Sequence, residues 1–281
     1  MKTRLITAGI AAAFAIAVMA LSEFFPWVLI AAICVVGCMM TFEFLTAKHM
    51  HKDIFILIMS IGFVVSSVIL SITNFWFVPL YVYTVVLMCV QVLRHEKHSI
   101  SDLLFVYAGI ILIGLALLCF ARLACVQWKF ASFFVCVAVV PPWFADSAAY
   151  FVGSAMGKRK LCPAISPKKT VEGAIGGAVA SILGSQLLGL VYQFIIYRNV
   201  IINYPALLLI GMFSAIVSVF GDLLFSLIKR ECKIKDYGSI MPGHGGMLDR
   251  FDSIIFTVPF ALFISYTMGI IWQIPVPVIP V

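Results

Sequence analysis

The sequence predicts an all-α polytopic membrane protein with about nine transmembrane helices and a cytoplasmic N-terminus. The chain of 281 residues is 63% hydrophobic and only 11% charged, with a mean hydropathy of +1.14, values that soluble domains do not reach. Apolar runs of roughly the length that crosses a bilayer follow one another along the chain. Lysines and arginines gather at alternate ends of these runs, which fixes an orientation.

The apolar runs define the expected elements in order. Five of them fall in the first part of the chain, at about residues 5–22, 25–42, 54–73, 76–93 and 103–121. Four more follow, at about residues 130–155, 174–196, 203–226 and 253–273. We expect residues 1–125 to be a scaffold of about five helices, because their acids and bases lie only at the ends of runs. We expect residues 126–281 to carry the chemistry, with cytoplasmic loops at 157–173 and 227–252.

The positive charge orients the chain. With the N-terminus inside, 16 of the 19 lysines and arginines face the cytoplasm, and the exceptions are Arg122, Lys129 and Arg198. The formal charge of +7 therefore belongs to short loops at a membrane face and does not predict binding to nucleic acid. Lys2 and Arg4 before the first run also fit a signal peptide, but a second run follows within a few residues. Either reading leaves the later topology unchanged.

The sixth and seventh runs contain polar features. Pro141 and Pro142 are expected to break the sixth run, and Asp146 follows within its apolar stretch. An acid inside a membrane segment marks a functional site by default; the alternative is a carboxylate satisfied by a neighbouring Ser or Tyr in the bundle. In the basic loop that follows, Thr170 is a predicted N-cap, and the GxxxG spacing from Gly173 predicts close helix packing. The eight cysteines form no CxxC pair and predict no disulfide framework.

The loop between the last two runs holds the densest polar chemistry of the chain. Its first half carries four cations, and its second half carries a glycine-framed histidine followed by acids. On one face of the eighth helix, Asp222 lies one turn before Ser226 and two turns before Lys229. Asp249 and Asp252 stand three residues apart at the start of the ninth run. If the last two helices are neighbours, three carboxylates converge there and repel one another. Mg²⁺ together with substrate phosphates would neutralise them; the alternative is a set of ordinary salt bridges to Lys229, Arg230 and Arg250.

These residues match a known signature. The eighth run ends in Gly221-Asp222-Leu223, and the loop continues through Ser226, Lys229, Arg230, Lys235, Asp236, Gly238, Pro242, Gly243, His244, Gly245, Gly246, Asp249, Arg250 and Asp252. A second block contains Asp146-Ser147, Ala149-Tyr150, Gly153, Gly157-Lys158, Ser166-Pro167, Lys169-Thr170 and Glu172-Gly173. The chain thereby resembles the CDP-diacylglycerol synthases, or phosphatidate cytidylyltransferases. Val171 departs from the Trp often found there.

The resemblance implies a nucleotidyltransferase of phospholipid biosynthesis, in which CTP and phosphatidate give CDP-diacylglycerol and pyrophosphate. It assigns Mg²⁺ to Asp222, Asp249 and Asp252, with K⁺ as a second cation. It assigns phosphate contacts to Lys229, Arg230 and Arg250. The expected substrate-binding residues are Asp146, Ser166, Lys168, Lys169, Ser226, Lys235, Gly243, Gly245 and Gly246. His244 either donates to a phosphate or shapes the turn.

The resemblance also implies a homodimer in a bacterial inner membrane, with the active site open to the cytoplasm and to the bilayer. Two other readings stay open from the residues alone. A CTP-dependent polyprenol kinase would also be polytopic and use CTP. A transporter would also place acids and Gly/Pro breaks in its spans, although here the polar residues are confined to the second half.

Overall fold

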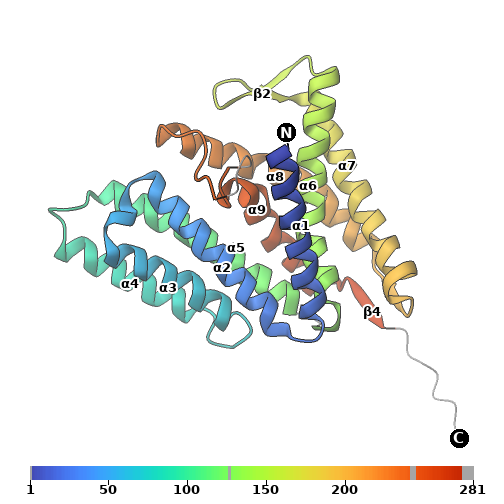
Figure 1. The fold of residues 1–281 in the computed structure, drawn as a ribbon, viewed down its shortest axis with the longest axis horizontal. Coiled ribbons are helices and arrows are strands. Elements are labelled where there is room, and N and C mark those ends of the chain that lie inside the picture. Colours follow the sequence, from blue (N-terminus) through green and yellow to red (C-terminus); the bar gives the residue numbers. More distant parts are fainter. Residues whose placement is uncertain (1, 126–127, 241–244, 274–281) are drawn as a thin grey trace, which may run out of the picture.

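The computed structural model describes residues 2–125, 128–240 and 245–273, and most of them are helical. The first part contains α1 (Lys2–Ser22), α2 (Pro26–Ala47), α3 (Ile54–Leu70), α4 (Val78–Leu93) and α5 (Ile100–Cys125), with a short 3₁₀ turn at Met50–Lys52. The second part begins with the 3₁₀ turn Trp128–Phe130 and contains α6 (Ala131–Met156), α7 (Val171–Val191), α8 (Tyr204–Glu231) and α9 (Leu248–Met268). In Figure 1, α2 to α5 lie together on one side and α6 and α7 on the other, with α9 between them and α8 extending toward the first group.

The all-α polytopic fold is confirmed. Six described helical segments are long and apolar enough to cross a membrane: Pro26–Ala47, Ile100–Cys125, Trp128–Met156, Val171–Tyr197, Tyr204–Glu231 and Leu248–Met268. The apolar stretches Gly9–Ser22, Ile54–Leu70 and Val78–Leu93 are shorter. Nine crossings therefore stay a prediction. The start of α1 and the β1–β2 hairpin lie toward the same side, opposite β4, which is the arrangement that the predicted topology requires (Figure 1).

The expected break at Pro141 and Pro142 is wrong. Helix α6 continues through both prolines to Met156. Each proline removes one backbone donor from the helix, but membrane helices tolerate this where neighbouring helices enclose the site. Both prolines are buried, and α6 packs on α5, α7, α8 and α9. Asp146 consequently lies on a continuous helix rather than after a break.

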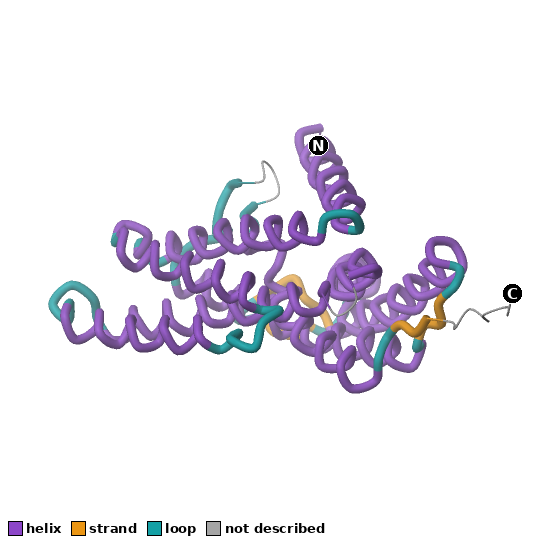
Figure 2. Tube along the Cα trace, turned by 90° about the horizontal axis from the view of Figure 1, so that it is seen from below, coloured by secondary structure: helices purple, strands orange, loops and turns teal. Residues whose placement is uncertain are grey.

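Two small antiparallel two-stranded sheets, absent from the sequence expectations, lie in the second part of the chain, where Figure 2 shows their strands in orange. Strands β1 (Lys160–Cys162) and β2 (Ser166–Thr170) lie in the predicted loop 157–173. Strands β3 (Val200–Ile202) and β4 (Ile271–Gln273) join the segment after α7, including its π-helical end Tyr192–Tyr197, to the chain that follows α9. The first hairpin matters for function because it delivers its last residues to the start of α7.

Close packing of α6, α7, α8 and α9 brings their polar residues together. A Cβ on Gly177 of α7 would stand 2.7 Å from the carbonyl oxygen of Ala145, one residue before Asp146. A Cβ on Gly221 of α8 would stand 2.8 Å from the carbonyl oxygen of Asp252 on α9. The predicted close packing through the GxxxG face is confirmed, as is the Thr170 cap, whose hydroxyl accepts the Gly173 amide at 3.1 Å. All eight cysteines are free.

Candidate active site

Three carboxylates from three helices meet within the second part. Asp146 comes from α6, Asp222 from α8 and Asp252 from the second turn of α9. Asp252 is 8% exposed and lies within electrostatic range of both other carboxylates. The predicted approach of α8 and α9 is therefore confirmed for Asp222 and Asp252. Asp146, a predicted substrate-binding residue, joins them.

Ser253 lies between two of these acids. Its hydroxyl is 2.8 Å from Asp146 Oδ2 and 3.3 Å from Asp252 Oδ1, and its amide donates to Asp252 Oδ1 at 2.7 Å. A serine hydroxyl has a single hydrogen to donate, so it cannot satisfy both carboxylates at once. The two like charges converge on one shared donor, and that arrangement favours a cation nearby.

Lys169 is the cation closest to Asp222. The last residues of β2 place its ammonium group 2.5 Å from Asp222 Oδ2, and the two side chains are 23% and 28% exposed. Ser226, one turn further along α8, donates to the other carboxylate oxygen at 3.2 Å. The β1–β2 hairpin and α8 thus meet at Asp222, as the predicted grouping of the two polar blocks requires.

Asp249 has different partners. Its Oδ1 accepts from Lys229 Nζ at 2.7 Å, and its Oδ2 accepts from the amides of Tyr237 and Gly246 at 2.9 and 3.0 Å. The Asp249 side chain is only 7% exposed. Its carboxylate therefore ties α8, the loop after α8 and the start of α9 together. The expected pairing of Lys229 with the face of Asp222 gives way to this contact with Asp249.

The remaining predicted site residues differ in their exposure. Gly243 and His244 lie outside the described residues. Gly246 is buried, whereas Ser166 and Gly245 are partly buried. The exposed cations are Lys168, Arg230, Lys235 and Arg250.

The donor set fits Mg²⁺ only in part. The described residues contain no group of three or more His, Cys, Asp or Glu side chains arranged to hold a metal ion. Mg²⁺ usually takes one or two carboxylates and completes its octahedron with water and substrate phosphates. Asp222 and Asp252 supply such a pair of hard oxygen ligands, and the doubly shared Ser253 hydroxyl shows that the local negative charge is under-compensated.

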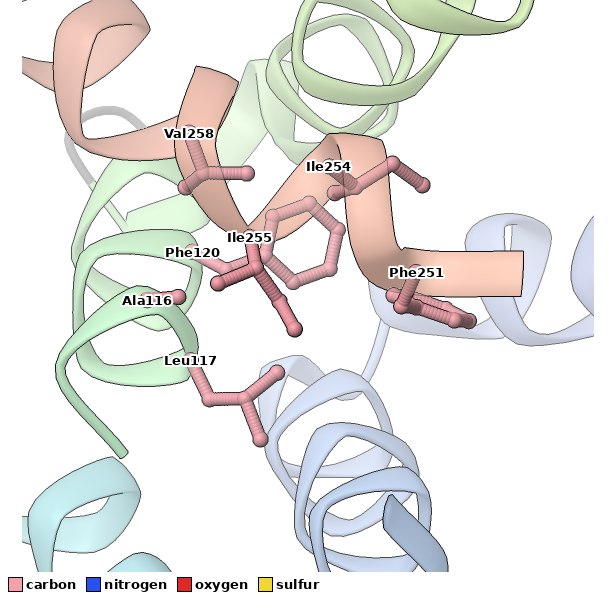
Figure 3. Close-up of a pocket in the computed structure, with 7 residues that line it drawn as sticks. All are labelled: Ala116, Leu117, Phe120, Phe251, Ile254, Ile255 and Val258. Atoms are coloured by element: carbon pink, nitrogen blue, oxygen red, sulfur yellow. The ribbon is translucent and has the colours of Figure 1, made fainter. Parts of the chain in front are cut away.

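A small cavity beside α9 is not part of this site. It has a volume of about 10 Å³ and lies between α5 and α9. Figure 3 shows that its lining side chains are all apolar: Ala116, Leu117, Phe120, Phe251, Ile254, Ile255 and Val258. A void of this size and character is a packing gap that stays dry.

Sequence reasoning missed two residues of the centre, Glu43 and Ser253. Glu43 follows the second predicted run, which we ended at residue 42, yet α2 continues to Ala47 and buries Glu43 to 2% exposure. The apolar residues on both sides of Glu43 were the signal that the helix continues past it. Ser253 carried no signal, because a serine in a membrane helix usually bonds its own backbone.

Fold and site together define a polytopic helical membrane protein in which carboxylates from three helices cluster with lysines. The model of the Cytidylyltransferase family matches residues 2–268. The chain belongs to this family.

Individual relatives agree with the family. The phosphatidate cytidylyltransferase of Bacillus subtilis is 48% identical over 132 residues, 47% of this chain and 46% of the relative. That of Staphylococcus haemolyticus is 36% identical over 62% of this chain and 63% of the relative. That of Rickettsia bellii is 32% identical over 78% of this chain and 95% of the relative. The chain spans about half to two-thirds of the length of the first two relatives.

Proposed function

We propose that the protein transfers the cytidylyl group of CTP to phosphatidate, giving CDP-diacylglycerol and pyrophosphate. The observation that carries the proposal is the group of Asp146, Asp222 and Asp252 with Lys169 at its edge, in a chain of the Cytidylyltransferase family. Relatives named phosphatidate cytidylyltransferase supply the substrates. The polyprenol kinase and the transporter are the alternatives that the experiment below must exclude.

The chemistry needs positioning more than a base. Phosphatidate is a phosphomonoester whose second pKa is about 6, so it is largely a dianion at neutral pH and is its own nucleophile. An oxygen of that phosphate forms a bond to the α-phosphorus of CTP, and the bond from the α-phosphorus to the bridging oxygen breaks as pyrophosphate leaves. The barrier comes from bringing polyanions together and from the charge that builds on the departing group.

The chain's own residues meet these needs. Lys169 stands at the boundary between the hairpin and α8, where a phosphate would compete with Asp222 for its ammonium group. Lys229 is 13% exposed and held by Asp249, so its charge is fixed in place before substrates bind. The exposed Lys168, Arg230, Lys235 and Arg250 would steer and hold the triphosphate from the cytoplasm.

Asp222 and Asp252 would hold Mg²⁺, which supplies positive charge to the α-phosphate and the departing pyrophosphate. Asp249 as a third ligand stays a prediction, since it would have to exchange its contact with Lys229. K⁺ as a second cation, a homodimer and a cytoplasm-facing site in a bacterial inner membrane complete the proposal.

The test follows the α- and γ-phosphates of CTP separately. Purified protein in lipid vesicles that contain phosphatidate and a polyprenol receives Mg²⁺ and CTP labelled at either the α- or the γ-phosphate. The α-label should enter lipid and the γ-label should leave as pyrophosphate. Transfer of the γ-label into a polyprenol would identify a kinase instead. No lipid labelling, with CTP unchanged, would contradict the proposal and leave the transporter.

A further inference from the structure

The buried carboxylate of Glu43 connects the first part of the chain to the site in the second. Its Oε1 accepts the Met247 amide at 3.0 Å and its Oε2 accepts the Leu248 amide at 2.8 Å. These two amides open α9, the helix that carries Asp249 and Asp252. The residue before α9, Met247, has no side chain that caps the helix. Glu43 therefore acts as the N-cap of α9 from a position about 200 residues earlier in the chain.

The loop before α9 closes around this carboxylate. A Cβ on Gly238 would clash with Glu43 Oε1, and a Cβ on Gly246 would stand 2.6 Å from Oε2. Any larger residue at either position would push the loop away from Glu43. Gly246 also donates its amide to Asp249 at 3.0 Å, so one residue contacts both acids.

Phe44, the next residue of α2, contacts the same loop. Its ring lies 6.4 Å from the ring of Tyr237 and stacks on Phe105 of α5 at 5.2 Å. Tyr237 is buried, donates its hydroxyl to the Phe225 carbonyl at 3.2 Å and its amide to Asp249 at 2.9 Å. Glu43 and Phe44 thus contact the loop at Gly246 and Tyr237, and both of these loop residues donate an amide to Asp249.

We propose that Glu43 is a positioning residue for cytidylyl transfer. It fixes the start of α9 and the loop before it, so that Asp249 and Asp252 keep the geometry that the reaction needs. This inference rests on the proposed function. Removing the carboxylate leaves two amides without their acceptor in a buried place, and the start of α9 would shift to find other partners. Displacement of reacting groups by about 1 Å can lower the rate about 100-fold.

The experiment compares Glu43→Ala and Glu43→Gln with two controls on the same side of the chain. Glu23→Gln makes the same chemical change at an acid that accepts the Ser132 hydroxyl at 3.0 Å. Thr41→Val alters a fully buried side chain of α2 whose hydroxyl has no hydrogen-bond partner among the described residues. Turnover per folded molecule and the KM for CTP are measured on monodisperse protein. Amide exchange is measured by mass spectrometry on peptides that cover residues 245–252.

Glu43→Ala should lower kcat about 100-fold with little change in KM and should speed exchange in 245–252. Glu43→Gln should fall between, because its carbonyl oxygen accepts only one of the two amides without rearrangement. Both controls should match the wild type. A residue that only stabilised the fold would lower the yield of folded protein and leave kcat per folded molecule unchanged.

Wild-type kcat in Glu43→Ala, or an activity loss with unchanged exchange, would overturn the inference. If Glu43→Ala does not fold, Glu43→Gln gives the same comparison with the carboxylate shape retained. The exchange measurement needs no catalytic activity. A wild-type protein that makes no CDP-diacylglycerol would therefore refute the proposed function and still leave the role of Glu43 at α9 measurable.

Discussion

Two charged clusters, one in each part of the chain, differ in how many hydrogen-bond donors and cations surround each carboxylate. At the start of α3, Asp53 is 3.0 Å from Arg94 and 3.0 Å from His98, and it caps the helix through the Phe55 amide at 3.1 Å. In the second part, Asp146, Asp222 and Asp252 have one ion pair among the residues that the structure describes, from Lys169 to Asp222. The first cluster surrounds one carboxylate with donors, whereas in the second Asp146 and Asp252 share the hydroxyl of Ser253.

This difference in the number of donors indicates which cluster has a structural role. A carboxylate with several donors gains nothing from a further cation, and it fixes the ends of helices. A cluster in which carboxylates share donors is stabilised by whatever positive charge arrives, and substrates with their metal bring it. The sequence contains acids and bases in both regions. Only the number of donors around each carboxylate in the structure distinguishes the two roles.

The largest expected effect comes from the second cluster. Asp252→Asn should lower kcat about 1000-fold, because it removes a charge that the reaction uses, while the protein inserts and purifies normally. We expect Asp222→Asn and Asp249→Asn to lose activity to a similar extent. Asp53→Asn is the matched control and should keep kcat within about two-fold of wild type. Radiolabelled lipid formation measures all four; an active Asp252→Asn protein would remove the distinction between the clusters.

A smaller loss should follow from the cation of the hairpin. Lys169→Met should lower kcat/KM for CTP about 100-fold, because it removes the ammonium group beside Asp222 that would contact phosphate. Lys168→Met, one residue earlier and exposed, should lower it about ten-fold or less. Initial rates against CTP concentration give both values. Equal effects of the two substitutions would mean that general positive charge, and not the placement of Lys169, binds the nucleotide.

The histidine of the glycine-framed turn should have a moderate effect. With phosphatidate as its own nucleophile, the rate at saturating Mg²⁺ should rise between about pH 6 and 7 and then level off. His244→Gln should lower the plateau and keep the rising limb. Loss of the limb, with activity restored by added imidazole, would instead make His244 a general base, whose ordinary pKa of about 6.5 overlaps that of the lipid.

The smallest effect concerns stability in the first cluster. Burial raises the pKa of Asp53, but hydrogen bonds from His98, Ile56 and Arg94 outweigh it and hold that pKa below its ordinary value. A lowered carboxyl pKa stabilises the fold above the ordinary pKa, and this contribution disappears as the pH falls through the folded value. The Tm difference between wild type and Asp53→Asn should therefore shrink from pH 6 toward about pH 3. A difference that does not depend on pH would show that the charge of Asp53 adds nothing.

Much of the fold could be predicted from hydropathy, because a bilayer forces apolar helices of defined length. The end of α2 could not, since Glu43 interrupts the apolar run although its carboxylate is satisfied by amides of α9. The four short β-strands were also missed, because strands of three to five residues leave no period to detect.

For the site, the chemistry of the loop predicted carboxylates and cations, and helix spacing correctly placed Ser226 beside Asp222. Which acid pairs with which lysine depends on the packing of segments that are far apart in sequence. Spacing on α8 alone suggested Lys229 with Asp222, and the structure pairs Lys229 with Asp249 and Lys169 with Asp222.

The most direct test of the central claim is the effect of Mg²⁺ with CTP on thermal stability, because it reads cation binding without turnover. At ligand concentrations of about 100 Kd, binding adds about 2.7 kcal/mol, a rise of roughly 5–10 °C in Tm for a chain of this size. We expect wild type and Asp53→Asn to show this rise and Asp252→Asn to show almost none. An equal rise in all three proteins would contradict the claim that the second cluster is the one that receives the cation.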